Sequence, residues 1–184
     1  TLDEHARLRA LNDSLKNLKR NLLAYKPRGM VLVPVIIETL YKRVWDEAKK
    51  SGKDKKLRFA VRLSKALLFV GIDLREKLFQ PVLAALGGRV EMIISGGAPL
   101  SPRLVRDLYA FGITVYEGYG ITECSPLVSV NAPGNIRLHS VGRPVGCCEV
   151  KISEENRKGK IGEILVKGDN VMLGYYKDPQ ATRE

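Results

Sequence analysis

The sequence predicts an α/β fold in which a partly parallel sheet flanked by helices is followed by a small β subdomain. Apolar residues recur at helical spacing in several segments before residue 88. A strand, a turn, a helix and a second strand then follow, which predicts a parallel pair joined by a crossover helix. Beyond Pro126 the helical spacing disappears and strand-like segments remain. We therefore divide the chain into a mainly helical basic part with one short strand (1–88), an α/β core (89–126) and the β subdomain (127–184).

The helical part begins with leucines spaced three and four residues apart over 11–23, which predicts an amphipathic helix capped by Asn12 or Asp13. Pro27 and Gly29 end this helix. A short buried strand is then expected over 30–33.

Pro34 stops this strand, and helical spacing returns over 36–45 and again over 59–68, with a basic loop between them. Residues 73–86 predict one more helix, which Pro81 kinks or breaks.

The core predicts a buried strand over 90–94, a turn of small residues and a helix that starts at Ser101 and Pro102. The next strand covers 113–116. In the β subdomain two strands are expected, over 145–152 and 161–166, and a polar turn at 154–159 joins them. Pro179 opens a last helix, which the chain end truncates.

Positive charge is concentrated in the first part of the chain. Residues 1–80 carry a net charge of +10, and the remainder carries only +1. The densest run, 49–56, fits either a surface for anionic lipid or nucleic acid, or a solvated surface between two helices, and the solvated surface is the preferred interpretation. No aromatic residue interleaves the run, so stacking on single-stranded nucleic acid has no support and no nucleic-acid partner is expected.

The cysteines Cys124, Cys147 and Cys148 are odd in number and lack metal-type spacing, so neither a disulfide framework nor a structural zinc site is expected. No secretory signal and no membrane span are apparent. The expected location is the cytoplasm, with peripheral contact at the inner face of a membrane as the alternative. The missing initiator Met predicts a longer parent protein.

Two glycine-rich segments follow strands of the core, at the sheet edge where parallel α/β proteins bind ligands. The first is Ser95 to Pro99, and the second, 116–123, combines the ring of Tyr119, the hydroxyl of Thr122 and the carboxylate of Glu123. At a nucleotide site the ring can stack on the base, the hydroxyl can contact a phosphate, and the carboxylate can bind Mg²⁺. Two tight turns shaped only for packing are the equally weighted alternative. Neither a Walker A pattern nor a complete GxGxxG is present.

Four motifs in order carry a resemblance to a known family. Residues 117–123 (Glu-Gly-Tyr-Gly-Ile-Thr-Glu) resemble the Tyr-Gly-x-Thr-Glu motif of the adenylate-forming, AMP-binding enzymes, and 95–100 resemble their adenine-side turn. Val-Gly-Arg-Pro at 141–144 resembles the family's Val-Gly-x-Pro. Gly-Glu-Ile-Leu-Val-Lys-Gly at 162–168 and Met-Leu-Gly-Tyr-Tyr at 172–176 together resemble its later Gly-Glu…Gly…Gly-Tyr-Tyr segment. The early part is most similar to long-chain fatty acyl-CoA synthetases.

The resemblance implies an acid–thiol ligase that uses ATP, Mg²⁺ and CoA: a fatty acid and ATP form an acyl-adenylate, and CoA then displaces AMP. It implies catalytic roles for Thr122 at the α-phosphate and for Glu123 as the Mg²⁺ ligand. The nucleotide-binding residues that it implies are Gly97, Ala98, Pro99, Glu117, Gly118, Tyr119, Gly120 and Thr122. The acyl-chain residues that it implies are Gly96, Gly118, Ile121 and Cys124.

The family's phosphate loop, its ribose-binding aspartate and its catalytic C-terminal lysine are not matched in this sequence. We therefore expect a middle fragment of the large N-terminal domain that is inactive alone. A parent that loads a carrier protein, and a non-catalytic module that binds through its basic face, are the alternatives. The sequence carries no signal for acyl length or oligomeric state.

Overall fold

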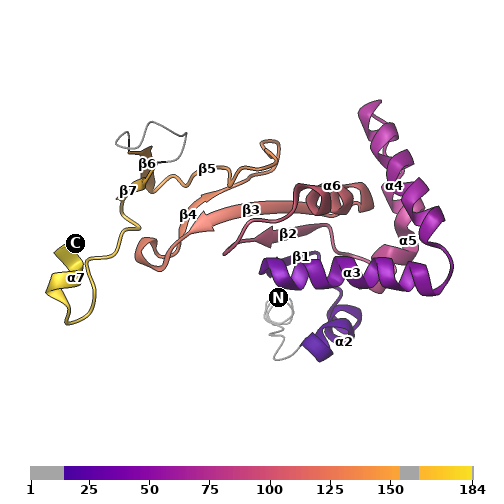
Figure 1. Cartoon of the computed structure of the whole chain (residues 1–184), viewed down its shortest axis with the longest axis horizontal. Coiled ribbons are helices and arrows are strands. Elements are labelled where there is room, and N and C mark those ends of the chain that lie inside the picture. The colour runs from indigo at the N-terminus through magenta and orange to yellow at the C-terminus, as the bar shows by residue number, and fades with distance from the viewer. Residues whose placement is uncertain (1–14, 154–161, 184) are drawn as a thin grey trace, which may run out of the picture. The chain divides into compact units, whose positions relative to one another are not determined.

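The computed structural model describes residues 15–153 and 162–183, and the chain divides into two compact units, Thr1–Val115 and Tyr116–Glu184. Figure 1 draws the elements of both units along the chain. The predicted cap of the first helix at Asn12 or Asp13 and the polar turn at 154–159 lie outside the described residues.

The first unit has helices on a parallel pair of strands. Strands β1 and β2 pair in parallel, with Met30 opposite Ile93 and Val31 opposite Ile94. Strand β3 begins at the end of this unit and is the next neighbour of β2 in the sheet order, and the amide of Thr114 donates to the carbonyl of Glu91. The partly parallel sheet of the prediction is therefore confirmed. The elements are α2 (Leu15–Tyr25), β1 (Gly29–Leu32), α3 (Pro34–Lys50), α4 (Asp54–Phe69), α5 (Arg75–Ala85), β2 (Met92–Ser95), α6 (Pro102–Phe111) and the start of β3 (Thr114–Gly120).

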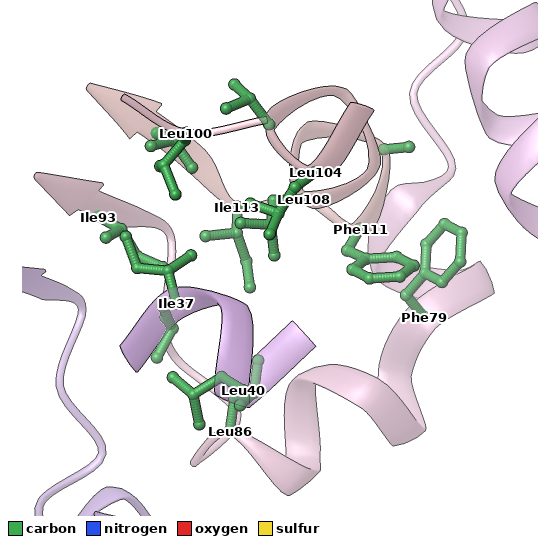
Figure 2. Packing of buried hydrophobic residues seen from close by; sticks show 14 of the residues in the cluster. Ile37, Leu40, Phe79, Leu86, Ile93, Leu100, Leu104, Leu108, Phe111 and Ile113 are labelled. Atoms are coloured by element: carbon green, nitrogen blue, oxygen red, sulfur yellow. The ribbon is translucent and has the colours of Figure 1, made fainter. Parts of the chain in front are cut away.

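The core of the first unit lies where α3, α5 and α6 meet the sheet (Figure 2). Phe79 of α5 and Phe111 of α6 are fully buried, with ring centroids 5.0 Å apart. Ile37 of α3 and Ile93 of β2 are 1% and 2% exposed. Each fully buried side chain of this size contributes about 1.5–3 kcal/mol relative to an exposed one, so this cluster holds the helices on the sheet.

Helix boundaries follow the signals in the sequence. Pro34 and Pro102 each stand in the first turn of a helix, where a missing amide costs no hydrogen bond. Helix α5 has a non-helical residue at Phe79, two positions before Pro81, which confirms the predicted kink. Helix α6 ends at Gly112, whose φ of 98° is the left-handed conformation that favours glycine.

Three predictions about the first unit were wrong in detail. The basic run at 49–56 is mostly helical, since only 51–53 lie between α3 and α4. Strand β1 is not buried, because it ends the sheet order and Val31 is 79% exposed. Strand β2 is buried on one face only: Ile93 and Ser95 are buried, whereas the alternate positions are exposed, because period-two alternation turns them away from the helices.

The second unit is built of antiparallel strands, as expected for the small β subdomain. Strand β3 pairs with β4 (Leu127–Val130), β4 pairs with β5 (Arg143–Pro144), and β6 (Cys148–Ile152) pairs with β7 (Ile164–Gly168). The expected strands at 145–152 and 161–166 are present with shifted bounds, whereas β4 was not predicted. A short helix η1 (Thr122–Cys124) follows β3, and α7 (Pro179–Arg183) is the predicted last helix.

Within the described ranges, no helix combines the length and the apolar character that crossing a membrane requires. Cys124, Cys147 and Cys148 are all free thiols.

Candidate nucleotide-binding site

The first candidate segment is the turn that follows β2. Ser95 is buried at the end of the strand, and its Oγ has no hydrogen-bond partner among the described residues. Gly97 adopts a φ of 92°, and the space around its α-carbon is open. Gly97, Ala98 and Pro99 are exposed, and the buried Leu100 anchors the end of the turn. The turn therefore offers a small, accessible surface against which a flat ring can lie.

The second candidate segment differs from the prediction, because 116–120 form the end of β3 and not a turn. Gly118 and Gly120 do not have positive φ values. They are required by close approach: a Cβ at Gly120 would collide with the carbonyl of Pro126, and one at Gly118 would lie 3.1 Å from the carbonyl oxygen of Ser129. The register of the β3–β4 pair shifts between Tyr119 and Gly120. The glycines thus let β4 pack closely against the motif strand.

The motif carboxylate lies just after β3, on η1. The hydroxyl of Tyr175 donates a hydrogen bond of 2.7 Å to Oε1 of Glu123, and the amide of Met172 donates to the Glu123 carbonyl, also at 2.7 Å. The bond from Tyr175, with a smaller backbone contribution, lowers the pKa of the Glu123 carboxyl below its usual value. The same bond raises the pKa of the Tyr175 hydroxyl. Glu123 is therefore ionised at neutral pH and held at a fixed position.

A buried amide supports the motif strand from β4's side. Asn131 is 4% exposed, its backbone amide donates to the carbonyl of Glu117 at 2.9 Å, and its side chain donates to the carbonyl of Ser140 at 2.6 Å. Its Oδ1 accepts the amide of Arg137 at 3.0 Å. This network fixes the backbone of β3 at Glu117, next to the glycine pair.

The remaining predicted site residues of the second unit differ in access. Thr122 is exposed and Tyr119 is half-buried, so both side chains are at least partly accessible to a ligand. Ile121 is 38% exposed, but Cys124 is 3% exposed. Burial, followed by the nearby Cys148 and Glu123, raises the pKa of the Cys124 thiol, so this side chain is an apolar packing group. Gly96, the other predicted acyl residue, is half-buried in the turn of the first unit.

Sequence reasoning missed two residues that shape the site. Tyr175 lies in the Met172–Tyr176 motif, but its pairing with Glu123 spans 52 positions and leaves no local signal. Asn131 follows a strand that was itself not predicted. Contacts between residues this far apart in the chain can be identified from the folded structure but not from local sequence patterns.

The side chains near Glu123 determine which kind of metal ion this part of the chain can hold. Within the described part of the chain, no group of three His, Cys, Asp or Glu side chains is gathered. Glu123 supplies one ionised carboxylate, which suits a cation that takes one or two carboxylates and completes its shell with water and substrate phosphate. The residues therefore fit Mg²⁺ held together with a nucleotide and do not fit an all-protein metal cage.

The fold is that of a part of larger adenylate-forming enzymes. An anthranilate CoA ligase solved with anthranoyl-AMP matches 91% of this chain and 27% of its own, with a TM-score of 0.62 and 19% identity. The A-PCP didomain of a carboxylic acid reductase from Segniliparus rugosus, in complex with AMP, matches 94% of this chain and 22% of its own, with a TM-score of 0.61 and 27% identity.

Sequence similarity assigns the chain to a protein family. The family model described as AMP-binding enzyme matches residues 7–176, and the chain belongs to that family. A long-chain-fatty-acid–CoA ligase 6 from Rattus norvegicus is 35% identical over 189 aligned residues, 96% of this chain. The chain spans about a quarter of that relative's length, since the match covers 26% of it.

Proposed function

We propose that the protein carrying this chain is an ATP-dependent fatty acid–CoA ligase. The observation that carries the proposal is the held carboxylate of Glu123 directly after the Tyr-Gly-Ile-Thr motif, fixed by a hydrogen bond from Tyr175. The similarity to long-chain-fatty-acid–CoA ligases over nearly the whole chain supports the choice of acyl substrate. Membership of the AMP-binding family supports the use of ATP.

In the proposed reaction a fatty-acid carboxylate oxygen attacks the α-phosphorus of ATP. The new O–P bond forms as the bond to pyrophosphate breaks. The sulfur of CoA then attacks the acyl carbon, its thiol proton is lost to solvent, and the acyl C–O bond breaks to release AMP. The exposed turn Gly97–Pro99 supports one face of adenine, and Tyr119 stacks on the other face. The hydroxyl of Thr122 donates to an oxygen of the α-phosphate, and backbone groups of 117–120 position the nucleotide.

Glu123 binds Mg²⁺ together with the phosphates in this proposal, and the bound ion offsets the negative charge on them. Tyr175 supports this role, because its hydrogen bond keeps the Glu123 carboxylate ionised and restricts its rotation. Gly96, Gly118, Ile121 and Cys124 are proposed to line the path of the acyl chain. Ile121 is 38% exposed, so its apolar side chain is accessible to an acyl chain, whereas Cys124 is 3% exposed and contributes as a buried apolar packing group.

The proposal is tested by Glu123→Gln in the intact protein. Removing a metal-ligand charge is expected to lower fatty-acid-dependent ATP–pyrophosphate exchange by about 10²-fold or more, with a smaller loss of ATP affinity. Glu149→Gln is the matched control, because Glu149 is an exposed carboxylate on β6 of the same unit. Unchanged exchange in Glu123→Gln would show that this carboxylate has no part in adenylation. Absence of any exchange with the wild-type protein and long-chain acids would remove the proposed substrate class.

A further inference from the structure

Asn170 lies in the turn that follows β7 and contacts a distant part of the second unit. Its Nδ2 donates a hydrogen bond of 2.9 Å to the carbonyl of Leu127, the first residue of β4, which is 43 positions away along the chain. The turn is closed by the amide of Val171, which donates to the carbonyl of Gly168 at 3.2 Å. Because Gly168 also belongs to the β6–β7 pair, Asn170 reaches Leu127 from a fixed position.

The side chain of Asn170 is buried with one of its polar atoms unpaired. It is 9% exposed, and its Oδ1 has no hydrogen-bond partner among the described residues. A leucine of similar size would fill the same space without an unpaired polar atom, so packing alone does not favour an asparagine here. What asparagine supplies is a donor, because the Leu127 carbonyl can only accept and the amide nitrogen must face it. Further chain in the intact protein cannot make this buried side chain more exposed.

The Leu127 carbonyl lies where the pairing of β3 with β4 is irregular. Leu127 is paired with Gly120, and the register shifts between Tyr119 and Gly120. A shifted register disrupts the ladder locally, so ladder bonds alone fix this end of β4 less firmly than a regular pair would. The hydrogen bond from Asn170 adds a constraint at this point.

The residues between η1 and β4 need such a constraint because their backbone is strained. We call residues 122–127 the Glu123 loop. Ser125, in the middle of this loop, has a φ of 55°, a left-handed conformation that is unfavourable for a residue with a side chain. Such a conformation persists only where the surrounding contacts hold it. Glu123 is held on one side of Ser125 by the two hydrogen bonds described above, and Leu127 is held on the other side by Asn170.

We propose that Asn170 is a positioning residue for adenylation, which holds Leu127 and thereby fixes the Glu123 loop before the nucleotide binds. The inference rests on the proposed function, in which Thr122 and Glu123 of this loop act at the α-phosphate and at Mg²⁺. Groups placed in advance need no rearrangement when charge develops in the transition state, so their position affects turnover most. Adenine is proposed to lie between Tyr119 and the turn Gly97–Pro99, outside the loop, so ATP binding should depend on Asn170 much less.

The test is Asn170→Leu in the intact protein, which keeps the side-chain volume and removes both the donor and the unpaired oxygen. It is expected to lower kcat of fatty-acid-dependent ATP–pyrophosphate exchange about ten- to hundredfold, with little change in KM for ATP and in the midpoint of thermal unfolding. Asn135→Leu is the matched control, since Asn135 is an exposed asparagine of the same unit, and it should change none of the three quantities. If Asn170→Leu fails to fold, Asn170→Ala removes the same donor without added bulk and should show the same loss of kcat.

Amide hydrogen exchange tests the same inference without turnover, nucleotide or metal. The amides of Cys124 and Ser125 donate to the carbonyls of Ile121 and Thr122 at 3.0 and 3.2 Å. In Asn170→Leu these two amides should exchange about tenfold faster than in the wild type, while the amides of β6 and β7 stay unchanged.

Three outcomes would overturn the inference: a wild-type kcat in the folded variants, a loss of kcat that only follows a loss of folded protein, or unchanged exchange at Cys124 and Ser125. A wild-type protein that shows no pyrophosphate exchange would count against the proposed function. The amide comparison separates the two failures, because it requires neither ATP nor a fatty acid.

Discussion

At the scale of single residues, the pair formed by Tyr175 and Glu123 connects electrostatics to the proposed chemistry. The hydroxyl of Tyr175 holds the pKa of the Glu123 carboxyl below its usual value. Tyr175→Phe removes this donor, so the pKa of Glu123 should rise toward its usual value. As the pH is lowered, adenylation by this variant should therefore be lost at a higher pH than in the wild type. The measurement is the pH profile of pyrophosphate exchange in the intact protein.

Tyr176→Phe is the matched control for this prediction. Tyr176 is the next residue, is 87% exposed, and its ring lies near the amine of Lys177. Its hydroxyl should not affect the acid limb of the profile. A profile of Tyr175→Phe that coincides with the wild type over the whole pH range would mean that the hydrogen bond does not tune Glu123.

A second residue-scale prediction concerns a buried carboxylate of the first unit. Asp107 is 4% exposed and accepts hydrogen bonds of 2.5 Å from the hydroxyl of Tyr41 and from the amine of Lys65. Burial, and then the bond to Asp107, raises the pKa of Tyr41 to about 12. Tyr41→Phe should lower the free energy of unfolding by about 1.5–3 kcal/mol at neutral pH, because a hydrogen bond to a charged group is lost.

The pH dependence of this difference has a defined sign. Because the folded pKa of Tyr41 is above the ordinary 10.0, its stabilisation is complete below that pH and is lost as the pH rises toward about 12. Urea unfolding of wild type and Tyr41→Phe should therefore give curves that converge in strong alkali. A gap that is constant across this range would contradict the assignment.

At the scale of elements, one glycine fixes the approach of the segment before β5 to β4. Gly142 has a φ of 82°, and a Cβ there would collide with the carbonyl group of Val130. Gly142→Ala should therefore destabilise the second unit by more than about 2 kcal/mol, through backbone strain and the clash together. Thermal unfolding measures the loss. Gly146→Ala is the control, because a Cβ at Gly146 would meet nothing within 4 Å, and an equal loss in both variants would refute the explanation.

The elements also show what sequence patterns can and cannot predict. Proline marked the end of the strand before α3, the start of α6 and the kink of α5, because it acts on the backbone next to it. The same logic failed at 116–120, where glycines were interpreted as a turn although they serve a close approach between β3 and β4. Such an approach depends on a partner strand that the sequence did not predict. The division of the chain at residues 88 and 126 stays a prediction.

The candidate site was predicted unevenly for the same reason. Thr122 and Glu123 were singled out by their place in a motif, and the structure adds an exposed hydroxyl and an ordered carboxylate there. Tyr175 and Asn131 act through contacts 52 and 14 positions away along the chain. No local spacing rule reaches that far, so only the folded chain reveals them.

At the scale of the whole molecule, the chain spans about a quarter of the length of its rat relative. Catalysis by several groups acting together is lost when some of them are missing. This chain alone should therefore form no acyl-CoA above a control without enzyme when supplied with ATP, Mg²⁺, CoA and a long-chain fatty acid. The intact protein under the same conditions is the positive control, and thioester formation by the isolated chain would contradict the prediction.

The hydrogen bond from the amide of Met172 to the carbonyl of Glu123 has a consequence for protein engineering. This bond joins Glu123 to a residue 49 positions later in the chain, and the hydroxyl of Tyr175 donates a second hydrogen bond to the same glutamate. In a chimaera whose crossover point falls between 124 and 171, Glu123 would come from one parent and its partners Met172 and Tyr175 from the other. Shuffling libraries built within the family should therefore keep 117–124 and 172–176 from one parent, and hybrids that separate them should be depleted among the folded, active clones.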